Sequence, residues 1–207
     1  MTTTTPKKTT KSKTTSSSTK TVKATPVSEN LPSNPFTFEV LDLVSRQRSN
    51  AKKVELLKKY EDMSLKAILI WNYDESLASA LPEGSVPYSG YSDQTSYSGT
   101  LTTKITEEIR KMHETGSFSL GNTSNDSNSR TTIRREWKNF YHFIKGGNDG
   151  MTQIRREMMF INILEGLHPL EAEILCLAKD KQLETKYKIT KQIVSEAYPD
   201  IVWGNRV

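Results

Sequence analysis

Apolar residues recur every three or four positions along most of the chain beyond residue 35. This spacing places them on one face of an α-helix, so each such row predicts an amphipathic helix. The rows predict helices over about 36–44, 50–60, 64–72, 101–112, 133–144, 154–166, 169–178 and 190–198. No segment of useful length alternates apolar and polar residues as a half-buried strand does. The pattern therefore predicts an all-α fold, a compact domain of about six to eight short helices.

Residues that favour a helix start precede two of these rows. Asn34 can cap the first helix with Pro35 as its first residue, because a side-chain oxygen satisfies a free backbone N–H and proline has none to satisfy. Pro169 is equally suited to the first position of the helix over 169–178. We expect both helices to begin at these prolines.

The strongest apolar row of the chain lies within 133–144. A single α-helix there would bury Trp137 and Tyr141 on one face. Gly146 and Gly147 follow the row, and we expect them to stop the helix in a turn that needs a positive φ. A phosphate-binding loop is the less favoured interpretation of these glycines, because the GxxxxGK[ST] layout is missing.

Two polar stretches interrupt the helices, and a third precedes them. Residues 74–99 and 116–129 are rich in glycine, proline, serine or asparagine and predict flexible loops within a single domain over 35–207. The first 28 residues include 16 Ser and Thr and no aromatic residue. Such a segment buries too little apolar surface to offset its ordering entropy, so we expect residues 1–34 to be a disordered tail.

Positive charge is concentrated at the N-terminus. The chain has 29 Lys and Arg against 24 Asp and Glu, a net charge of +5. Residues 1–28 contain no acid and six lysines, which are Lys7, Lys8, Lys11, Lys13, Lys20 and Lys23. The remaining residues therefore have 23 basic and 24 acidic side chains, a net charge of −1. Within them, segment 129–160 has seven basic and three acidic residues, a local excess of +4.

The available side chains disfavour several chemistries. One cysteine excludes a disulfide framework, and three scattered histidines lack the spacing of a metal site. The longest apolar run, Ala67 to Trp71, is too short to span a membrane. Cys176 lies among leucines as core cysteines do, and Glu171 and Glu173 are interpreted as acids of a helix surface. We therefore expect no bound metal, no cofactor and no membrane partner.

Basic residues are the most informative candidates for a binding site. They are Arg130, Arg134, Arg135, Lys138, Arg155 and Arg156 in the body, and Lys7, Lys8, Lys11 and Lys13 in the tail. Arg130, Arg134 and Lys138 recur every four residues, which would align them on one helix face. Such a row could bind nucleic-acid phosphates or an acidic protein surface. It could also be the solvated face of an amphipathic helix, and both interpretations stay open.

Four motifs follow one another along the chain. They are Leu81-Pro82-Glu83-Gly84 with Pro87-Tyr88, then Tyr141 to Gly146, Leu164 to Leu175, and Lys179 to Lys188. Together they resemble a family of small helical proteins from tailed bacteriophages whose function is not established, over about residues 36–199. The resemblance implies no catalytic residue. It does imply a phage context, in the cytoplasm of an infected bacterium or in the virion.

We therefore expect a non-enzymatic phage protein that acts through contacts with nucleic acid or with a phage or host protein. As a virion component or a DNA-transaction accessory, it would use its basic segment or its tyrosine-rich loop for those contacts. The lysine-rich tail would add weak, salt-sensitive affinity that is blind to sequence. The alternative is an enzyme whose site lies between loop 74–99 and helix 130–146, built from Tyr88, Glu83 and His142.

Overall fold

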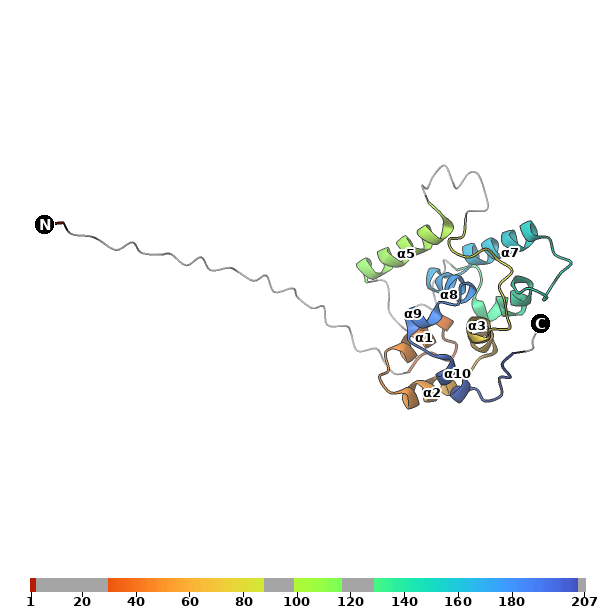
Figure 1. Cartoon of the computed structure of the whole chain (residues 1–207), viewed down its shortest axis with the longest axis horizontal. Coiled ribbons are helices and arrows are strands. Elements are labelled where there is room, and N and C mark those ends of the chain that lie inside the picture. Colours follow the sequence, from red (N-terminus) through yellow and green to blue (C-terminus); the bar gives the residue numbers. More distant parts are fainter. Residues whose placement is uncertain (3–29, 88–98, 117–128, 205–207) are drawn as a thin grey trace.

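The computed structural model describes residues 1–2, 30–87, 99–116 and 129–204. These residues form nine α-helices and one 3-10 helix, with no strand among them (Figure 1). The prediction of an all-α fold is confirmed. In chain order the helices are α1 (Thr37–Ser45), α2 (Asn50–Lys59), α3 (Met63–Tyr73), α5 (Leu101–Thr115), α6 (Ile133–Glu136), the 3-10 helix η2 (Trp137–Phe143), α7 (Gln153–Gly166), α8 (Pro169–Lys179), α9 (Leu183–Tyr187) and α10 (Lys191–Ala197).

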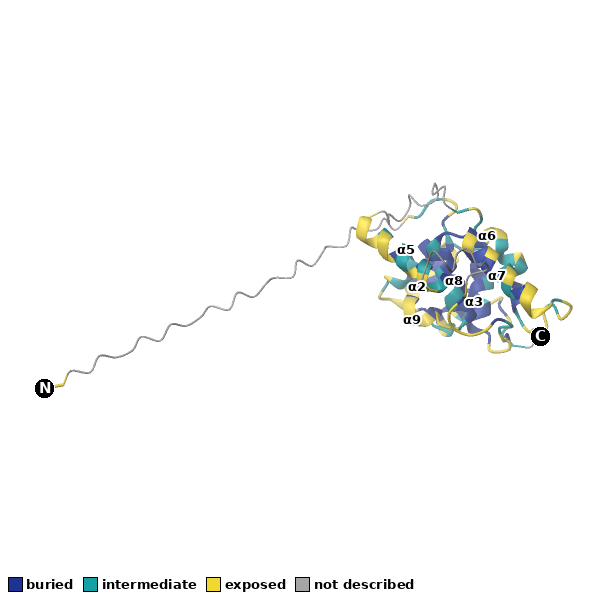
Figure 2. Ribbon diagram, turned by 90° about the horizontal axis from the view of Figure 1, so that it is seen from above, coloured by how far each residue is buried: buried dark blue, intermediate teal, exposed yellow. Residues whose placement is uncertain are grey.

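Helix α8 is the centre of the fold. It packs against α1, α3, α5, α7 and α9, whereas α2 packs mainly on α1 and α10. Four residues of α8 are completely buried, namely Ala172, Ile174, Leu175 and Ala178. Figure 2 shows the buried residues gathered around α3 and α8, with exposed residues on the outer helices. The core is therefore formed by one central helix and the helices that surround it.

Helix α1 begins two residues later than predicted, with Phe36 as its N-cap. The backbone N–H of Phe36 donates to Oε2 of Glu39 at 2.8 Å, so an acid of the first turn satisfies it. Asn34 does not cap the helix, because its side-chain oxygen accepts from the guanidinium of Arg134 at 3.0 Å. The prediction for α8 is confirmed, since Pro169 is its first residue.

The predicted helix with the strongest apolar row is not a single α-helix. It is one α-helical turn, α6, followed directly by the 3-10 helix η2. Three residues per turn place Trp137, Phe140 and Phe143 in one row. Phe140 and Phe143 are buried, with ring centroids 5.5 and 6.1 Å from that of Trp71. Tyr141 falls outside this row and is 49% exposed, so its predicted burial is wrong; Trp137 is only partly buried.

The first part of the predicted loop 74–99 is packed against the body. Four of its described residues are buried, which are Asp74, Leu77, Leu81 and Val86. The backbone N–H of Ala80 donates to the carbonyl of Phe143 at 2.8 Å, which joins this segment to the end of η2. Residues 88–98 and 117–128 lie outside the described residues.

Asn30 and Leu31, which precede the predicted start of the domain at residue 35, contact α2 and its C-cap. The backbone N–H of Leu31 donates to the hydroxyl of Tyr60 at 3.0 Å, and the Lys59 ammonium donates to the side chain of Asn30 at 2.9 Å. These contacts hold residues 30 and 31 against the C-terminal end of α2. The tail residues 3–29 lie outside the described part of the chain, among them Lys7, Lys8, Lys11 and Lys13.

Helix α9 lies where no helix was expected, because five residues are too few to show a helical period. Leu183 and Tyr187 are buried, and the N–H of Leu183 donates to Oδ1 of Asn72 at 3.1 Å. The helix ends at Lys188, whose φ is +51° and whose carbonyl accepts from the Lys53 ammonium at 2.6 Å. Tertiary contacts therefore stabilise this short element.

Candidate functional site

A hollow of about 840 Å³ lies between η2, the loop that follows it and α7, and we call it the η2–α7 hollow. Its α7 side is formed by Arg155, Met158, Met159 and Asn162, and its η2 side by Thr131, Glu136 and His142. At one end the N–H of Thr131 donates to the carbonyl of Gly166 at 3.0 Å. At the other end the Arg156 guanidinium donates to the carbonyl of Asn148 at 2.8 Å. The two walls therefore run in opposite directions, and the hollow follows α7 from Arg155 to Ile163, a length of about 12 Å.

The wall on the η2 side is polar. Asn139 and His142 of the 3-10 helix, and Glu136, which immediately precedes it, are spaced by three residues and lie on one side. The Glu136 carboxylate accepts from the hydroxyl of Thr131 at 2.6 Å and from the amide of Asn139 at 2.9 Å. The amide nitrogen of Asn148 lies 2.9 Å from Nδ1 of His142, to which it donates. Hydrogen bonds between side chains thus hold this wall in place.

A second row of η2 faces solvent. Lys138 and Tyr141 are also three residues apart, and both side chains are exposed. The Tyr141 ring lies against His142, with 3.9 Å between the ring centroids. The Lys138 ammonium lies 5.9 Å from the centroid of the Trp137 ring, within the range of a cation–π contact. The 3-10 helix therefore presents an exposed aromatic ring beside a cation.

The wall on the α7 side combines apolar side chains with one cation. Met158 is 39% exposed, and Ile154, one turn earlier on the same helix, is 77% exposed. Met159 lines the hollow beside Met158, and Arg155 adds the positive charge. Flexible methionine side chains adapt their shape to a partner, which is typical of binding surfaces.

Four of the six cations predicted in the body are free to bind a partner. The side chains of Arg130, Arg135, Lys138 and Arg155 are exposed, and none forms a hydrogen bond or ion pair with another described residue. We call these four the unpaired cations. The straight row expected on one helix face does not form, because Arg130 precedes α6 and Lys138 lies in the 3-10 helix.

The other two predicted cations hold the fold together. Arg134 donates to the carbonyl of Pro35 at 3.3 Å, and its Nε lies 3.6 Å from Oδ2 of Asp62. Arg156 is only 8% exposed and donates to the carbonyl of Met151 at 3.3 Å, in addition to its bond at the end of the hollow. Both guanidinium groups therefore bond to backbone carbonyls within the chain.

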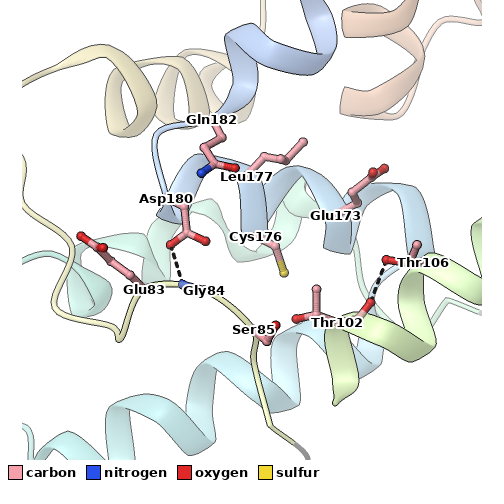
Figure 3. A pocket seen from close by; sticks show the side chains of 10 residues that line it. All are labelled: Glu83, Gly84, Ser85, Thr102, Thr106, Glu173, Cys176, Leu177, Asp180 and Gln182. Atoms are coloured by element: carbon pink, nitrogen blue, oxygen red, sulfur yellow. Dashed lines mark hydrogen bonds between the residues drawn. The ribbon is translucent and has the colours of Figure 1, made fainter. Parts of the chain in front are cut away.

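A second hollow of about 650 Å³ lies between α5, α8 and the segment that contains Glu83 (Figure 3). Two of its three lining carboxylates form ion pairs within the chain. Asp180 pairs with Lys179, and Glu173 pairs with Lys186. Intramolecular pairing therefore offsets most of the negative charge that could attract a cationic ligand.

Cys176 lies inside this second hollow, between α8 and α5 (Figure 3). Burial raises the pKa of its thiol to about 12. The group is therefore a neutral thiol at physiological pH, and only the thiolate is a good nucleophile. No histidine is present among the described residues that line the hollow. The arrangement favours the interpretation of Cys176 as a packing residue.

Two of the three residues suggested for an enzyme site line different hollows. Glu83 lines the second hollow and His142 lines the η2–α7 hollow, while Tyr88 lies outside the described residues. In the described part of the chain, no three His, Cys, Asp or Glu side chains gather so as to hold a metal ion. Among the described helices, none is long and apolar enough to cross a bilayer.

Glu171 is buried, with 1% of its surface exposed, so its interpretation as a surface acid is wrong. Burial raises the pKa of this carboxyl to about 7. Perturbed pKa values often mark functional sites, but Glu171 lines neither of the two hollows and bonds only to backbone N–H groups. Its role is therefore structural.

Comparison with known proteins assigns the chain to a family. It matches the "Family of unknown function (DUF6433)" over residues 40–127 and 120–185. The chain belongs to the DUF6433 family. No curated protein and no solved structure matches it. The expected membership of a family without established function is confirmed, whereas the phage origin of this DUF6433 protein stays a prediction.

Sequence reasoning missed the exposed ring of Tyr141 in this DUF6433 protein. The α-helical period assigned Tyr141 to the core with Trp137. A signal was present in the spacing of Trp137, Phe140 and Phe143, which recur every three residues as in a 3-10 helix. The exposure of Ile154 and Met158 had no comparable signal, because apolar residues at helical spacing normally face a core.

Proposed function

We propose that this DUF6433 member is a non-enzymatic protein that binds nucleic acid through the unpaired cations of its body. The observation that carries the proposal is the exposure of Arg130, Arg135, Lys138 and Arg155, whose side chains form no hydrogen bond or ion pair with another described residue. Several other cations of the body are paired, as in Arg46–Asp42, Arg110–Glu114 and Lys186–Glu173.

Unpaired guanidinium groups suit phosphate binding for a physical reason. A phosphate can accept two parallel hydrogen bonds from one guanidinium, and here no ion pair has to break first. Three of the four unpaired cations are arginines. The six lysines of residues 1–28 would add positive charge that attracts the phosphate backbone of the nucleic acid independently of its sequence. An acidic protein surface is the competing ligand for such a site.

The proposed setting is a cell infected by a tailed bacteriophage, which the sequence motifs support. There the protein would be either a virion component or an accessory to a DNA transaction in the bacterial cytoplasm. Mass spectrometry of purified phage particles separates these roles. Stoichiometric presence in the particle supports the first, and absence from it supports the second.

Binding to duplex DNA across a salt series tests the proposal. The proteins compared are the full chain, a chain beginning at Asn30, and the full chain with Arg130→Glu, Arg135→Glu and Arg155→Glu. A matched control reverses three exposed cations elsewhere that also have no described partner, with Arg48→Glu, Lys58→Glu and Lys111→Glu. The start at Asn30 keeps the contacts that fix the segment on α2.

We expect the reversal of the three arginines to lower the slope of log K against log salt by about 3, since each phosphate contact contributes about 0.9. The chain beginning at Asn30 is expected to bind with a smaller slope than the full chain but with measurable affinity. An equal loss in the control triple, or no DNA binding by the full chain at low salt, would contradict the proposal. Binding to polyglutamate in that case would instead indicate an acidic protein partner.

A further inference from the structure

We infer that the preferred ligand of the surface around Tyr141, Lys138 and Arg155 is single-stranded nucleic acid. One base stacks on Tyr141, and the two cations bind neighbouring phosphates. The inference rests on the proposed function and narrows it to a substrate class. It follows from three features, which are the exposed ring on η2, the closely packed backbone beneath it, and two exposed cations, Lys138 on η2 and Arg155 on α7.

The Tyr141 ring is exposed, and its position is fixed from behind. The ring contacts the imidazole of His142, at 3.9 Å between centroids and with 38° between the ring planes, and the side chain forms no hydrogen bond with another described residue. The Tyr141 carbonyl accepts from the N–H of Ile144 at 3.3 Å. Gly147 packs on the same carbonyl so closely that a Cβ there would lie 2.0 Å from the oxygen. A ring on such a backbone can accept a base with little loss of conformational entropy.

Two exposed cations lie in the neighbourhood of this ring. Lys138 precedes Tyr141 by one 3-10 turn, a rise of about 6 Å along the helix axis. Arg155 lies across the hollow that His142, the ring neighbour of Tyr141, also lines. Lys138 and Arg155 are therefore the exposed cations available to the phosphates next to a base on Tyr141.

This arrangement favours single strands over duplexes. The faces of duplex bases are covered by their neighbours, so a duplex can use only the cations. A single strand exposes its base faces, and stacking on an aromatic side chain contributes about 1–3 kcal/mol per base with little sequence preference. The ring thus provides the preference for single strands, and the cations provide affinity for single strands and duplexes alike.

The experiment measures binding of a fluorescent oligothymidine of about 15 nucleotides and of a matching duplex. It compares the wild-type full chain with Tyr141→Leu, which keeps an apolar side chain but removes the ring. Tyr141→Phe is the rescue variant, because the hydroxyl has no partner among the described residues. Ultraviolet cross-linking of the wild-type protein to the oligothymidine, followed by peptide mass spectrometry, locates the contact without any variant.

We expect Tyr141→Leu to weaken oligothymidine binding by about 5- to 150-fold, while duplex binding changes by less than about twofold. Tyr141→Phe should bind like the wild type, and the cross-link should fall on the peptide that contains Tyr141. Equal effects on both ligands, or a duplex preference of the wild type, would overturn the inference. If the arginine triple loses binding while Tyr141→Leu keeps it, the inference fails and the proposed function stands. Failure of the wild type to bind either ligand overturns both.

Discussion

The carboxylate of Glu171 accepts the backbone N–H of Ile133 at 3.0 Å, although the two residues are 38 positions apart. Its other oxygen accepts the N–H of Thr37 at 3.2 Å. Thr37 and Ile133 are the first residues of α1 and α6, and Glu171 lies in the first turn of α8. Three helices therefore begin around one buried carboxylate, which satisfies N–H groups that a helix start leaves free. Because α6 continues into η2, this contact also positions the proposed binding surface.

Removing this carboxylate is expected to destabilise the fold. Glu171→Ala leaves two buried N–H groups without an acceptor, and each such group costs about 1–3 kcal/mol. We predict a fall of about 2–4 kcal/mol in the free energy of unfolding at neutral pH, measured by urea denaturation. Glu165→Ala on the exposed side of α7 is the control and should change stability by less than about 0.5 kcal/mol. Similar stability of the two variants would contradict the role of Glu171.

The same residue is expected to make stability depend on pH. Its pKa is about 7 in the folded protein and 4.5 at its ordinary value, and burial is the main cause. Because the folded pKa is the higher one, the contribution is complete below about pH 4.5 and is lost as the pH rises through about 7. The corresponding free energy is about 3 kcal/mol.

The Glu171→Gln variant isolates this effect, because glutamine does not titrate. Its amide oxygen can accept only one of the two N–H groups, so the variant should be less stable than the wild type at about pH 5. We expect the difference between the two proteins to narrow as the pH rises to about 8, as seen in urea denaturation at several pH values. A difference that stays constant or widens would show that Glu171 does not titrate in this range.

Much of the fold follows from patterns that a sequence displays directly. Rows of apolar residues predicted the long helices, and Pro169 marked the start of α8 because proline at the first position needs no N–H acceptor. Elements whose limits depend on distant residues were mispredicted. The N–H of Phe36 is satisfied by Glu39, and Asn34 bonds instead to Arg134, a residue 100 positions away.

The candidate site was predicted only in part. The basic residues of segment 129–160 were identified from charge, which the sequence shows directly. The division into unpaired cations and structural arginines depends on carbonyl groups, such as those of Pro35 and Met151, that folding brings to the guanidinium. The 3-10 geometry that exposes Tyr141 also depends on tertiary packing of Phe140 and Phe143 against Trp71.

Cys176 is expected to react slowly with alkylating agents. A pKa raised from 9.0 to about 12 lowers the thiolate fraction at neutral pH by about a thousandfold. Because the chain has one cysteine, mass spectrometry of iodoacetamide-treated protein reports this group alone. The alkylation rate should rise steeply when the same protein is unfolded in urea. A rate that is already high in the folded state would show that the thiol is activated and would support the enzyme alternative.

Gly147 is expected to tolerate no side chain. A Cβ at this position would lie 2.0 Å from the carbonyl oxygen of Tyr141, which backbone movement alone can relieve. We predict that Gly147→Ala lowers the free energy of unfolding by about 2–4 kcal/mol. Gly84→Ala is the matched control, since φ there is +84° but nothing lies within 4 Å, and its cost should be about 1–2 kcal/mol. If thermal unfolding shows Gly147→Ala to be no more destabilising than Gly84→Ala, the contact between the new Cβ and the Tyr141 carbonyl costs no stability and the prediction is wrong.

Arg155 and Arg156 are neighbours in sequence, but we expect their substitutions to have opposite effects. Arg156 is buried and bonds to two backbone carbonyls, so Arg156→Ala should lower the free energy of unfolding by about 2–4 kcal/mol. Arg155 is exposed and has no described partner, so Arg155→Ala should change stability by less than about 0.5 kcal/mol.

For nucleic-acid binding we expect the reverse, with a larger effect of the substitution at Arg155 than of the one at Arg156. Arg155→Ala removes one phosphate contact and is expected to lower the salt slope for a single strand by about 0.7. Arg156→Ala should keep the wild-type slope at temperatures where the variant remains folded, because its guanidinium is committed to the loop carbonyls. Circular dichroism on the same samples verifies the folded state. Equal effects of the two substitutions on both stability and binding would contradict the assignment of a structural role to Arg156 and a binding role to Arg155.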